Sequence, residues 1–254
     1  MKTEILYEDK SIMVVRKPAG LAVQSAGIGQ PDVVSELKSY LAKLPGAGRT
    51  GKGEPYLGIV HRLDQPVEGL LVFAKDTKAA AALSKQLTEG ALNKHYYAVL
   101  CGYPDCPEGD LVDYLRKEGN VAVAVTGREQ EFADAKIAAL HYRILEEINA
   151  PSPLALADVT IGTGRFHQIR VQFAHAGFPL FGDTKYGTAV LKEAMSAQKY
   201  RGVALCAYSL ELVHPVSGKK MGFRVVPKNP AFAGFAMEEL KKLTENETGI
   251  SKRG

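Results

Sequence analysis

The feature that most constrains the fold of this chain is a series of short apolar runs joined in pairs by tight turn sequences. ILY and IMVVRK flank the polar turn EDKS, KIAALHYRILEEI and LALADVTI flank NAPSP, and GVALCAYSLELVHP and KKMGFRVVP meet around VSGK. Runs rich in β-branched and aromatic residues, bounded by such turns, are typical of β-hairpins. Hairpins join neighbouring antiparallel strands, so the sequence predicts a sheet whose strands are mostly antiparallel.

Helical periodicity is found in four segments. Asp32 can cap the first helix, Gly90 ends the second and Gly177 ends the third, in which Ile169 and Phe173 begin an apolar stripe that continues to Ala176. The predicted helices cover residues 33–41, 77–89, 166–176 and 231–243. Further strands are predicted for YLGIV, GLLVFAK and KHYYAVLCG. The stretch that follows, up to about residue 135, is expected to be irregular because its VAVAV run alternates only small residues.

Because strands predominate and pair as hairpins, we predict the α+β class, with a large mixed, mostly antiparallel sheet flanked by helices and loops, rather than a doubly wound fold. With 254 residues, 46% of them hydrophobic, the chain can bury a sizeable core. Its 32 basic and 28 acidic residues give a net charge of +4, which suits a polyanionic partner and equally an ordinary solvated surface.

The cysteine count and the N-terminal composition bear on the compartment. The three cysteines show neither paired CxxC spacing nor a partner histidine cluster, so we expect reduced core residues rather than disulfides or a zinc site. The N-terminus MKTEILYEDK carries charges where a signal peptide needs an apolar region. Since no segment approaches the uncharged length of a membrane helix, we expect no membrane association and a cytoplasmic protein.

Two glycine-rich segments approach nucleotide-binding motifs without completing them. GAGRTGKG at 46–53 has Gly53 where a P-loop needs Ser or Thr, and no strand precedes it, so we interpret it as a basic loop in which Arg49 and Lys52 can touch phosphates. GTGRFH lacks the third glycine of the dinucleotide pattern. The histidines are not spaced as metal ligands. We therefore expect no nucleotide cofactor and no metal.

One carboxylate needs a partner. Asp64 ends the motif VHRLD, shortly before the apolar run LLVFA, and a half-buried carboxylate costs several kcal/mol unless a cation pairs with it. Arg170 in RFHQIR is the candidate cation, because a basic residue at the start of a helix is unfavourable unless a carboxylate attracts it. The alternative is an ordinary solvated helix end formed by Arg165, His167, Gln168 and Arg170.

A strand carries a third group of candidates. Lys94 and Tyr96 lie in KHYYAVL, where alternation directs Tyr96 and Tyr97 to opposite faces of the sheet. A tyrosine beside a pair of arginine and carboxylate offers a flat face on which a nucleobase can stack. Plain core packing is the alternative for Tyr96.

Taken together and in this order, the motifs resemble the RluA/RsuA family of RNA pseudouridine synthases, and more closely its RluA branch. The match covers about nine-tenths of the chain and runs through IMVVRKPAGLAVQ, HRLD with GLLVFAKD, NKHYYAVLCG, TGRFHQIRVQFAHAGFPLFGDTKYG and LELVHPVSG. The resemblance implies the pseudouridine synthase fold with two lobes around a central cleft. It also implies a catalytic domain over 1–230, followed by a C-terminal helix and basic tail over 231–254. An N-terminal S4 domain is not expected, since the family-like sequence begins by residue 5.

The resemblance implies isomerisation of uridine within RNA to pseudouridine, without cofactor. Asp64 matches the family's catalytic aspartate, Arg170 the arginine that pairs with it, and Tyr96 the tyrosine that stacks on the target base. Arg62 matches a residue that enters the RNA where the uridine has flipped out. The expected RNA-binding residues are His61, Arg62, Lys94, Arg165, His167 and Gln168. We expect the substrate to be rRNA or tRNA and the enzyme to act as a monomer.

The sequence departs from the family pattern at three positions. Val67 and Glu68 replace the usual Thr-Ser after the catalytic turn, which predicts an added negative charge near the RNA path, and Leu140 replaces a Thr. These departures keep a second function open, namely a catalytically inactive RNA-binding protein of the same fold. A metal-dependent hydrolase is a third reading.

Overall fold

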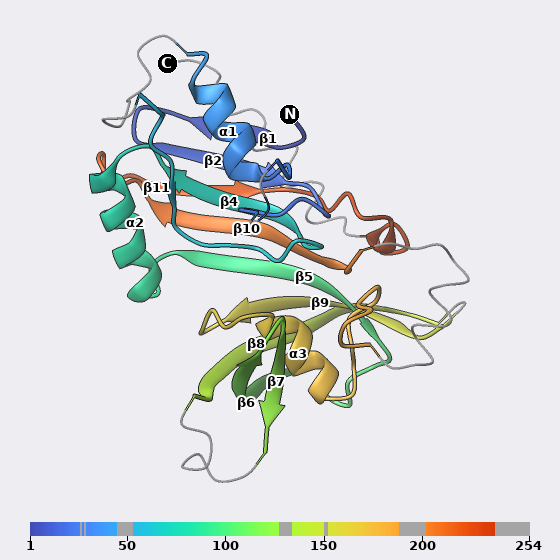
Figure 1. The fold of residues 1–254 in the computed structure, drawn as a ribbon. Coiled ribbons are helices and arrows are strands. Elements are labelled where there is room, and N and C mark those ends of the chain that lie inside the picture. Colours follow the sequence, from blue (N-terminus) through green and yellow to red (C-terminus); the bar gives the residue numbers. More distant parts are fainter. Residues whose placement is uncertain are drawn as a thin grey trace. The chain divides into compact units, whose positions relative to one another are not determined.

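The computed structural model describes residues 1–25, 27, 29–44, 53–126, 134–149, 152–187 and 202–236. These residues form two compact units. Unit 1 contains the described residues of 1–94 and 207–227, and unit 2 those of 95–206 and 228–236. The described residues include three α-helices and eleven strands, and Figure 1 labels all of these elements except β3. The α+β class with a large, mostly antiparallel sheet, predicted from the hairpin pattern, is confirmed.

Unit 1 begins with the hairpin that the EDKS turn predicts. Strands β1 (Glu4–Glu8) and β2 (Ile12–Lys17) pair antiparallel, and β2 is buried along its whole length. Strand β2 pairs with β4 (Glu68–Ala74), and β4 pairs with the short β3 (Gly58–Ile59). The motif HRLD lies in the segment between β3 and β4, as expected.

A second hairpin of unit 1 explains a glycine that follows HRLD. Strands β10 (Leu205–Val213) and β11 (Lys220–Arg224) pair around VSGK, and β10 lies beside β4. Gly69 in β4 has a φ of +129°, and a Cβ atom there would lie 2.4 Å from the carbonyl oxygen of Ala207. Only glycine fits this position without displacing one of the two strands.

Two helices of unit 1 have the caps that the sequence predicts. Helix α1 (Val33–Leu41) begins after Asp32, whose side chain accepts a hydrogen bond from the backbone N–H of Ser35. Helix α2 (Thr77–Thr88) packs against β4 and ends two residues before Gly90, which has a φ of +72°. The apolar face of α1 is buried at Val33, Val34, Leu37 and Leu41.

Unit 2 is an antiparallel sheet with one helix laid across it. Its strands follow the order β5, β9, β8, β6 and β7, with bounds Asn93–Cys101, Leu154–Ile161, Lys136–Ile148, Glu108–Glu118 and Val121–Val125. Strands β8 and β9 form the hairpin predicted around NAPSP. Helix α3 (Gln168–His175) lies across β6 and β7 (Figure 1).

Residues 108–125 were expected to be irregular, and this prediction is wrong. They form the β6–β7 hairpin, which turns at Gly119 with a φ of +57°. Only one residue of β6, Leu115, is buried, so the sequence has little of the apolar alternation that identifies a strand. Pairing of β6 with β8, a strand more than twenty residues further along, provides the stability that local propensity lacks.

The third helix does not have the predicted apolar stripe on one face. Residues 168–173 are buried all round and Ala176 is exposed, so this prediction is wrong. All three cysteines are free, but Cys106 is exposed rather than in the core. Of the predicted helix 231–243, the structure describes a short 3-10 turn at Pro230–Phe232, and residues from 237 onward lie outside the described part, so the domain boundary at 230 stays a prediction.

The prediction for the glycine-rich segment, including Arg49 and Lys52, also falls outside the described residues. Among the helices that are described, none has both the length and the apolar character needed to cross a membrane.

Candidate active site

The segment that holds Asp64 alternates its side chains between the interior and the surface of unit 1. His61 and Leu63 are buried, Arg62 is exposed and Asp64 is half-buried. The backbone N–H of Val67 donates to the Asp64 carbonyl oxygen at 3.1 Å, which closes a tight turn directly after the aspartate. Arg62 therefore faces outward and Asp64 is partly enclosed, while Leu63 and His61 hold the segment against the core.

The ammonium group of Lys17 anchors the turn after Asp64. Lys17 ends β2, is fully buried, and its Nζ donates to the carbonyl oxygens of Pro18, Leu21 and Gln65 at 3.0, 2.7 and 3.0 Å. Burial lowers the pKa of Lys17 to about 7, while the charges of Asp64 and Glu68 act in the opposite direction. Lys17 thus ties the backbone beside Asp64 to β2, and its charge interacts with the Asp64 carboxylate.

His61 is a neutral residue that connects the HRLD segment to β4 by a hydrogen bond, rather than a charged residue that binds a ligand. Its Nε2 accepts a hydrogen bond from the backbone N–H of Val72 in β4 at 3.2 Å, so the ring proton lies on Nδ1. Burial, together with the nearby charge of Lys94, lowers the pKa of His61 to about 3. Burial also lowers the pKa of Lys94 itself. His61 is therefore uncharged at neutral pH and holds the HRLD segment against β4.

Glu68 does not add a negative charge to the surface, so that expectation is wrong. The side chain is only 3% exposed, and its carboxylate pairs with the guanidinium of Arg16 at 3.3 Å. Arg16 also donates to the carbonyl oxygen of Val226 at 2.7 Å. Arg16 and Glu68 compensate each other inside unit 1, and Val67 is buried beside them, so both departures from the family pattern are absorbed by packing.

In unit 2, Arg170 is held by a carboxylate that the sequence reading did not single out. Its Nε and Nη2 donate to the two oxygens of Asp183 at 2.7 and 2.9 Å, and both side chains are at most 4% exposed. Asp183 also accepts the backbone N–H groups of Lys185 and Tyr186. The guanidinium of Arg170 also lies 5.1 Å from the centre of the Tyr186 ring. Arg170 is therefore fixed from two sides and is not a solvated helix end.

Gln168 organises the loop before α3. Its Oε1 accepts from the Thr163 hydroxyl at 2.8 Å and from the Arg165 backbone N–H at 2.9 Å, and its Nε2 donates to the carbonyl oxygen of Ala139 at 3.0 Å. The side chain is only 4% exposed. Gln168 thus ties the loop before α3 to the backbone of β8.

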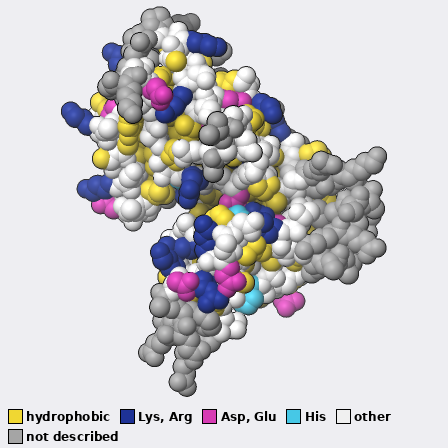
Figure 2. Space-filling view, in the orientation of Figure 1, with side chains coloured by type: hydrophobic (Ala, Val, Ile, Leu, Met, Phe, Trp, Pro, Cys, Tyr) yellow, Lys and Arg dark blue, Asp and Glu magenta, His cyan; other side chains and the backbone are white. Residues whose placement is uncertain are grey.

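His167 caps α3 in an unusual backbone conformation. Its φ of +53° is the single left-handed value among the described residues other than glycine. Its Nδ1 lies 2.6 Å from the Tyr186 hydroxyl, which also accepts the backbone N–H of Ala122. Such a conformation persists only where the surroundings hold it, and functional sites are where it is often found. Figure 2 shows Lys and Arg side chains, with Asp, Glu and His side chains among them, close to hydrophobic ones over the part of unit 2 around α3.

Tyr96 lies on the face of the unit 2 sheet that carries α3. It is opposite Val159 in the β5–β9 pair, and Val159 is opposite Tyr142, which packs edge-on against Phe173 of α3. Tyr96 and Tyr97 are both buried, at 5% and 8% exposure, so burial does not separate the two faces. The structure thus gathers Tyr96 and the start of α3 in unit 2, and His61, Arg62, Asp64 and Lys94 in unit 1.

Two residues of the candidate site, Asp183 and Lys17, were not predicted from the sequence, although the sequence around each of them indicates a buried charged group. Asp183 in LFGDTKY is a carboxylate after an apolar run, the same signal that pointed to Asp64. Lys17 ends an apolar strand directly before a Pro-Ala-Gly turn, where a buried ammonium can bond to carbonyl oxygens of the turn.

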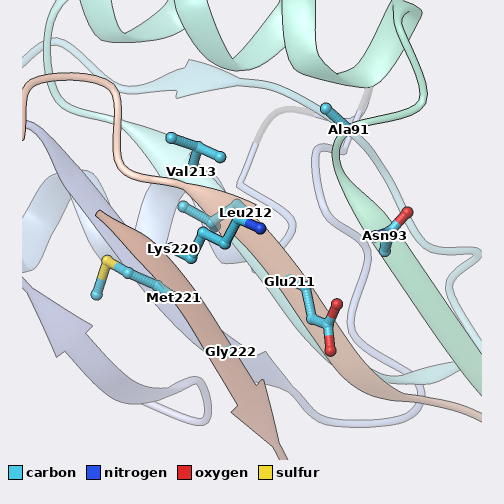
Figure 3. A pocket seen from close by; sticks show the side chains of 8 residues that line it. All are labelled: Ala91, Asn93, Glu211, Leu212, Val213, Lys220, Met221 and Gly222. Atoms are coloured by element: carbon cyan, nitrogen blue, oxygen red, sulfur yellow. The ribbon is translucent and has the colours of Figure 1, made fainter. Parts of the chain in front are cut away.

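Unit 1 also has a shallow open groove of about 490 Å³ on the β10–β11 hairpin (Figure 3). Glu211, Lys220 and Met221 line it together with residues 91 and 93 before and at the start of β5. None of the predicted site residues lines this groove.

Comparison with known proteins gives a consistent family. The family model for RNA pseudouridylate synthase matches residues 11–175. The chain is 35% identical over 230 residues to "Ribosomal large subunit pseudouridine synthase D" of Zymomonas mobilis, covering 87% of this chain and 68% of that protein. Proteins of the same name match at 35% identity in Pseudomonas aeruginosa and 36% in Escherichia coli, with 87% and 86% of this chain and 67% and 65% of those proteins covered.

Solved structures agree on the fold. The human RNA pseudouridylate synthase domain containing 1 aligns with a TM-score of 0.71 at 19% identity, over 96% of this chain and 94% of that chain. The human domain containing 4 aligns with a TM-score of 0.69 at 24% identity, over 94% and 93%. The chain belongs to the RNA pseudouridylate synthase family, in the RluA branch that its motifs indicated, and is an RNA pseudouridine synthase.

Proposed function

We propose that this enzyme isomerises uridine in RNA with Asp64 as the nucleophile. The observation that carries the proposal is the anchoring of the Asp64 segment from both sides. The buried ammonium of Lys17 bonds to the carbonyl oxygen of Gln65, and the buried ring of His61 bonds to β4. A nucleophilic carboxylate is most effective when its position is fixed before the substrate arrives.

The reaction balances without an added oxidant or reductant. The bond between ribose C1′ and N1 of uracil breaks, the base turns while it is held in the site, and a bond from C1′ to C5 forms. C5 loses its proton and N1 gains one. The carboxylate of Asp64 bonds to the target nucleotide and leaves again, so the enzyme needs a nucleophile, a fixed pocket and a proton acceptor. We therefore propose that neither a metal nor a cofactor takes part.

Arg170 is the proposed cation that keeps the nucleophile ionised when water is excluded. A guanidinium carries five N–H donors, so a bidentate pair with Asp183 is compatible with a second carboxylate. Asp183 and the Tyr186 ring fix the guanidinium plane, which lets it direct a carboxylate rather than merely attract one.

Tyr96 is the proposed stacking partner of the target base and assists in removing the proton from C5. Flipping a nucleotide out of an RNA stack costs a few kcal/mol, and stacking on an aromatic ring offsets part of this cost. The exposed Arg62 is the proposed side chain that fills the vacated space in the RNA.

The remaining predicted RNA contacts divide into two groups by their surroundings. Arg165, His167 and Lys94 are half-buried and are proposed to contact RNA directly. His61 and Gln168 are buried and bonded to protein groups, so we propose that they act on RNA binding by holding the HRLD segment and the loop before α3.

We propose large-subunit ribosomal RNA as the substrate, because the relatives from three organisms are named ribosomal large subunit pseudouridine synthase D. Transfer RNA is the other substrate class that the sequence left open. We also propose that the enzyme is cytoplasmic and that it acts as a monomer. Light scattering of the purified chain tests whether it is a monomer.

The decisive experiment uses Asp64→Asn, which keeps the size of the side chain and removes its charge. We expect loss of tritium release from 5-tritiated uridine in ribosomal RNA, at least a thousandfold under multiple-turnover conditions, with RNA affinity within a few fold of wild type. Undiminished turnover in this variant would end the proposal for Asp64. If the wild-type chain binds RNA and releases no tritium from either RNA class, it is a catalytically inactive RNA-binding protein.

A further inference from the structure

An exposed aromatic ring stands at the start of α3, in the loop that also carries Arg165 and His167. Phe166 is 38% exposed, although it belongs to a residue type that is usually buried. It lies four residues before Arg170 in the chain. Neither the predicted catalytic residues nor the predicted RNA contacts include it.

The ring of Phe166 is held in place from behind. Its centre lies 3.8 Å from the centre of the His167 ring, and the two planes are 21° apart, so the rings are stacked. His167 is fixed by its left-handed backbone and by the Tyr186 hydroxyl at 2.6 Å. A ring that is already ordered loses little entropy when a second flat group stacks on it.

Lys117 lies beside this ring, and Arg165 precedes Phe166 in the chain. The ammonium of Lys117, an exposed residue of β6, lies 5.0 Å from the centre of the Phe166 ring. Arg165 is oriented by a hydrogen bond from its Nε to the carbonyl oxygen of Ile137 at 2.9 Å. Neither cation forms an ion pair with another residue in the described part of the chain. An exposed ring beside these two basic side chains suits a ligand that is flat and anionic.

We propose that Phe166 and Lys117 form a nucleotide subsite that stacks an unpaired base of the RNA substrate, next to the target uridine. This inference rests on the proposed function and assigns residues that it does not use. The base lies on the ring face opposite His167, and the flexible Lys117 side chain moves from the ring to a phosphate oxygen. Arg165 holds a neighbouring phosphate. Since every base has a flat face, the subsite selects single-stranded RNA rather than a particular sequence.

The test compares affinities of the full chain for two probes at fixed salt, a single-stranded RNA decamer of mixed sequence containing one 2-aminopurine and the matching duplex. We expect Phe166→Leu, which keeps an apolar contact with His167 but has no aromatic face, to weaken decamer binding about tenfold. Phe166→Tyr is the matched control and is expected to bind within about twofold of wild type. Lys117→Gln is expected to lower the slope of log affinity against log salt by about one.

Equal binding of the decamer by wild type and Phe166→Leu would overturn the subsite, and so would an equal loss for decamer and duplex. If the RNA affinity does not change when Phe166 is replaced, contact with a protein partner would remain as the explanation for the exposed ring. A measurement on the wild-type chain does not depend on how the variants fold. Cross-linking of a 5-iodouridine decamer should label residues 165–167, and labels confined to other segments would contradict the proposal.

Different experiments test the proposed subsite and the proposed role of Asp64, so one proposal can be wrong while the other holds. Asp64→Asn is expected to bind the decamer as wild type does while forming no pseudouridine. If Asp64→Asn stays active, the nucleophile assignment is wrong and the decamer affinities of the Phe166 variants still decide the subsite.

Discussion

Arg170 shows how a single buried cation is made both tolerable and useful. A guanidinium that is 96% buried would be strongly destabilising without a carboxylate, and Asp183 meets it with two hydrogen bonds while also accepting two backbone N–H groups. The carboxylate and the arginine are thirteen residues apart, so the pair closes the loop after α3 onto the helix.

At the same scale, Asp183→Ala is expected to lower the free energy of unfolding by about 3–5 kcal/mol, because it leaves a buried guanidinium without this partner. Urea unfolding at pH 7 measures the change. Glu211→Ala is the control, since Glu211 is half exposed and lies 3.9 Å from Arg224, and it should cost less than about 1 kcal/mol. Equal costs for the two variants would mean that Asp183 does not stabilise the charge of Arg170.

The burial and the ion-pair partner of Glu68 could not be predicted from its neighbours in the sequence. In the string VEGLLVF it stands beside an apolar run, and nothing local says whether it faces solvent or the core. Arg16, fifty-two residues earlier, supplies the countercharge through the β2–β4 pair, where it lies opposite Leu70. The sequence shows the sign of a side chain's charge, but the register of the strands determines which residue pairs with it.

At the scale of elements, the β4–β10 contact depends on one glycine. Gly69→Ala is expected to cost about 2–5 kcal/mol of stability, because it combines a positive φ with a Cβ atom 2.4 Å from the Ala207 carbonyl oxygen.

Gly90→Ala separates these two causes. Gly90 also has a positive φ, of +72°, but no atom lies within 4 Å of the position of its Cβ. Its alanine variant is expected to cost only about 1–2 kcal/mol. Thermal unfolding of both variants measures the difference, and a Gly69 variant as stable as the Gly90 variant would show that β10 shifts away without cost.

At the scale of the whole molecule, stability should depend on pH through Lys17. Its pKa is lowered to about 7 in the folded chain, whereas an unfolded lysine keeps a pKa near 10.4. Between these values the unfolded state binds more protons, so the Lys17 contribution to stability rises as pH increases from about 7 to 10. Below pH 7 both states carry the charge, and the folded state bears the full cost of burying it.

Urea unfolding of wild type and Lys17→Met at several pH values between 6 and 10 tests this dependence. The difference in stability between the two should change in favour of wild type as pH rises. Lys10→Met, at an exposed turn position, is the control and should leave the pH profile unchanged. Parallel profiles for wild type and Lys17→Met would show that Lys17 titrates alike in the folded and unfolded states.

Local patterns were sufficient for most of the elements. The hairpins around EDKS, NAPSP and VSGK, the caps at Asp32 and before Gly90, and the helix that contains Arg170 follow from turn residues and periodicity over a few positions. The motifs in order were sufficient for the family. These features depend on neighbours in sequence, which a string of letters displays directly.

Only the tertiary structure decided the rest, because the deciding interactions join residues far apart in the chain. The β6–β7 hairpin needs β8, Glu68 needs Arg16, Arg170 is held by Asp183, and His61 is neutral because unit 1 buries it beside Lys94. Burial and partner choice depend on register and packing, which have no local signature in the sequence.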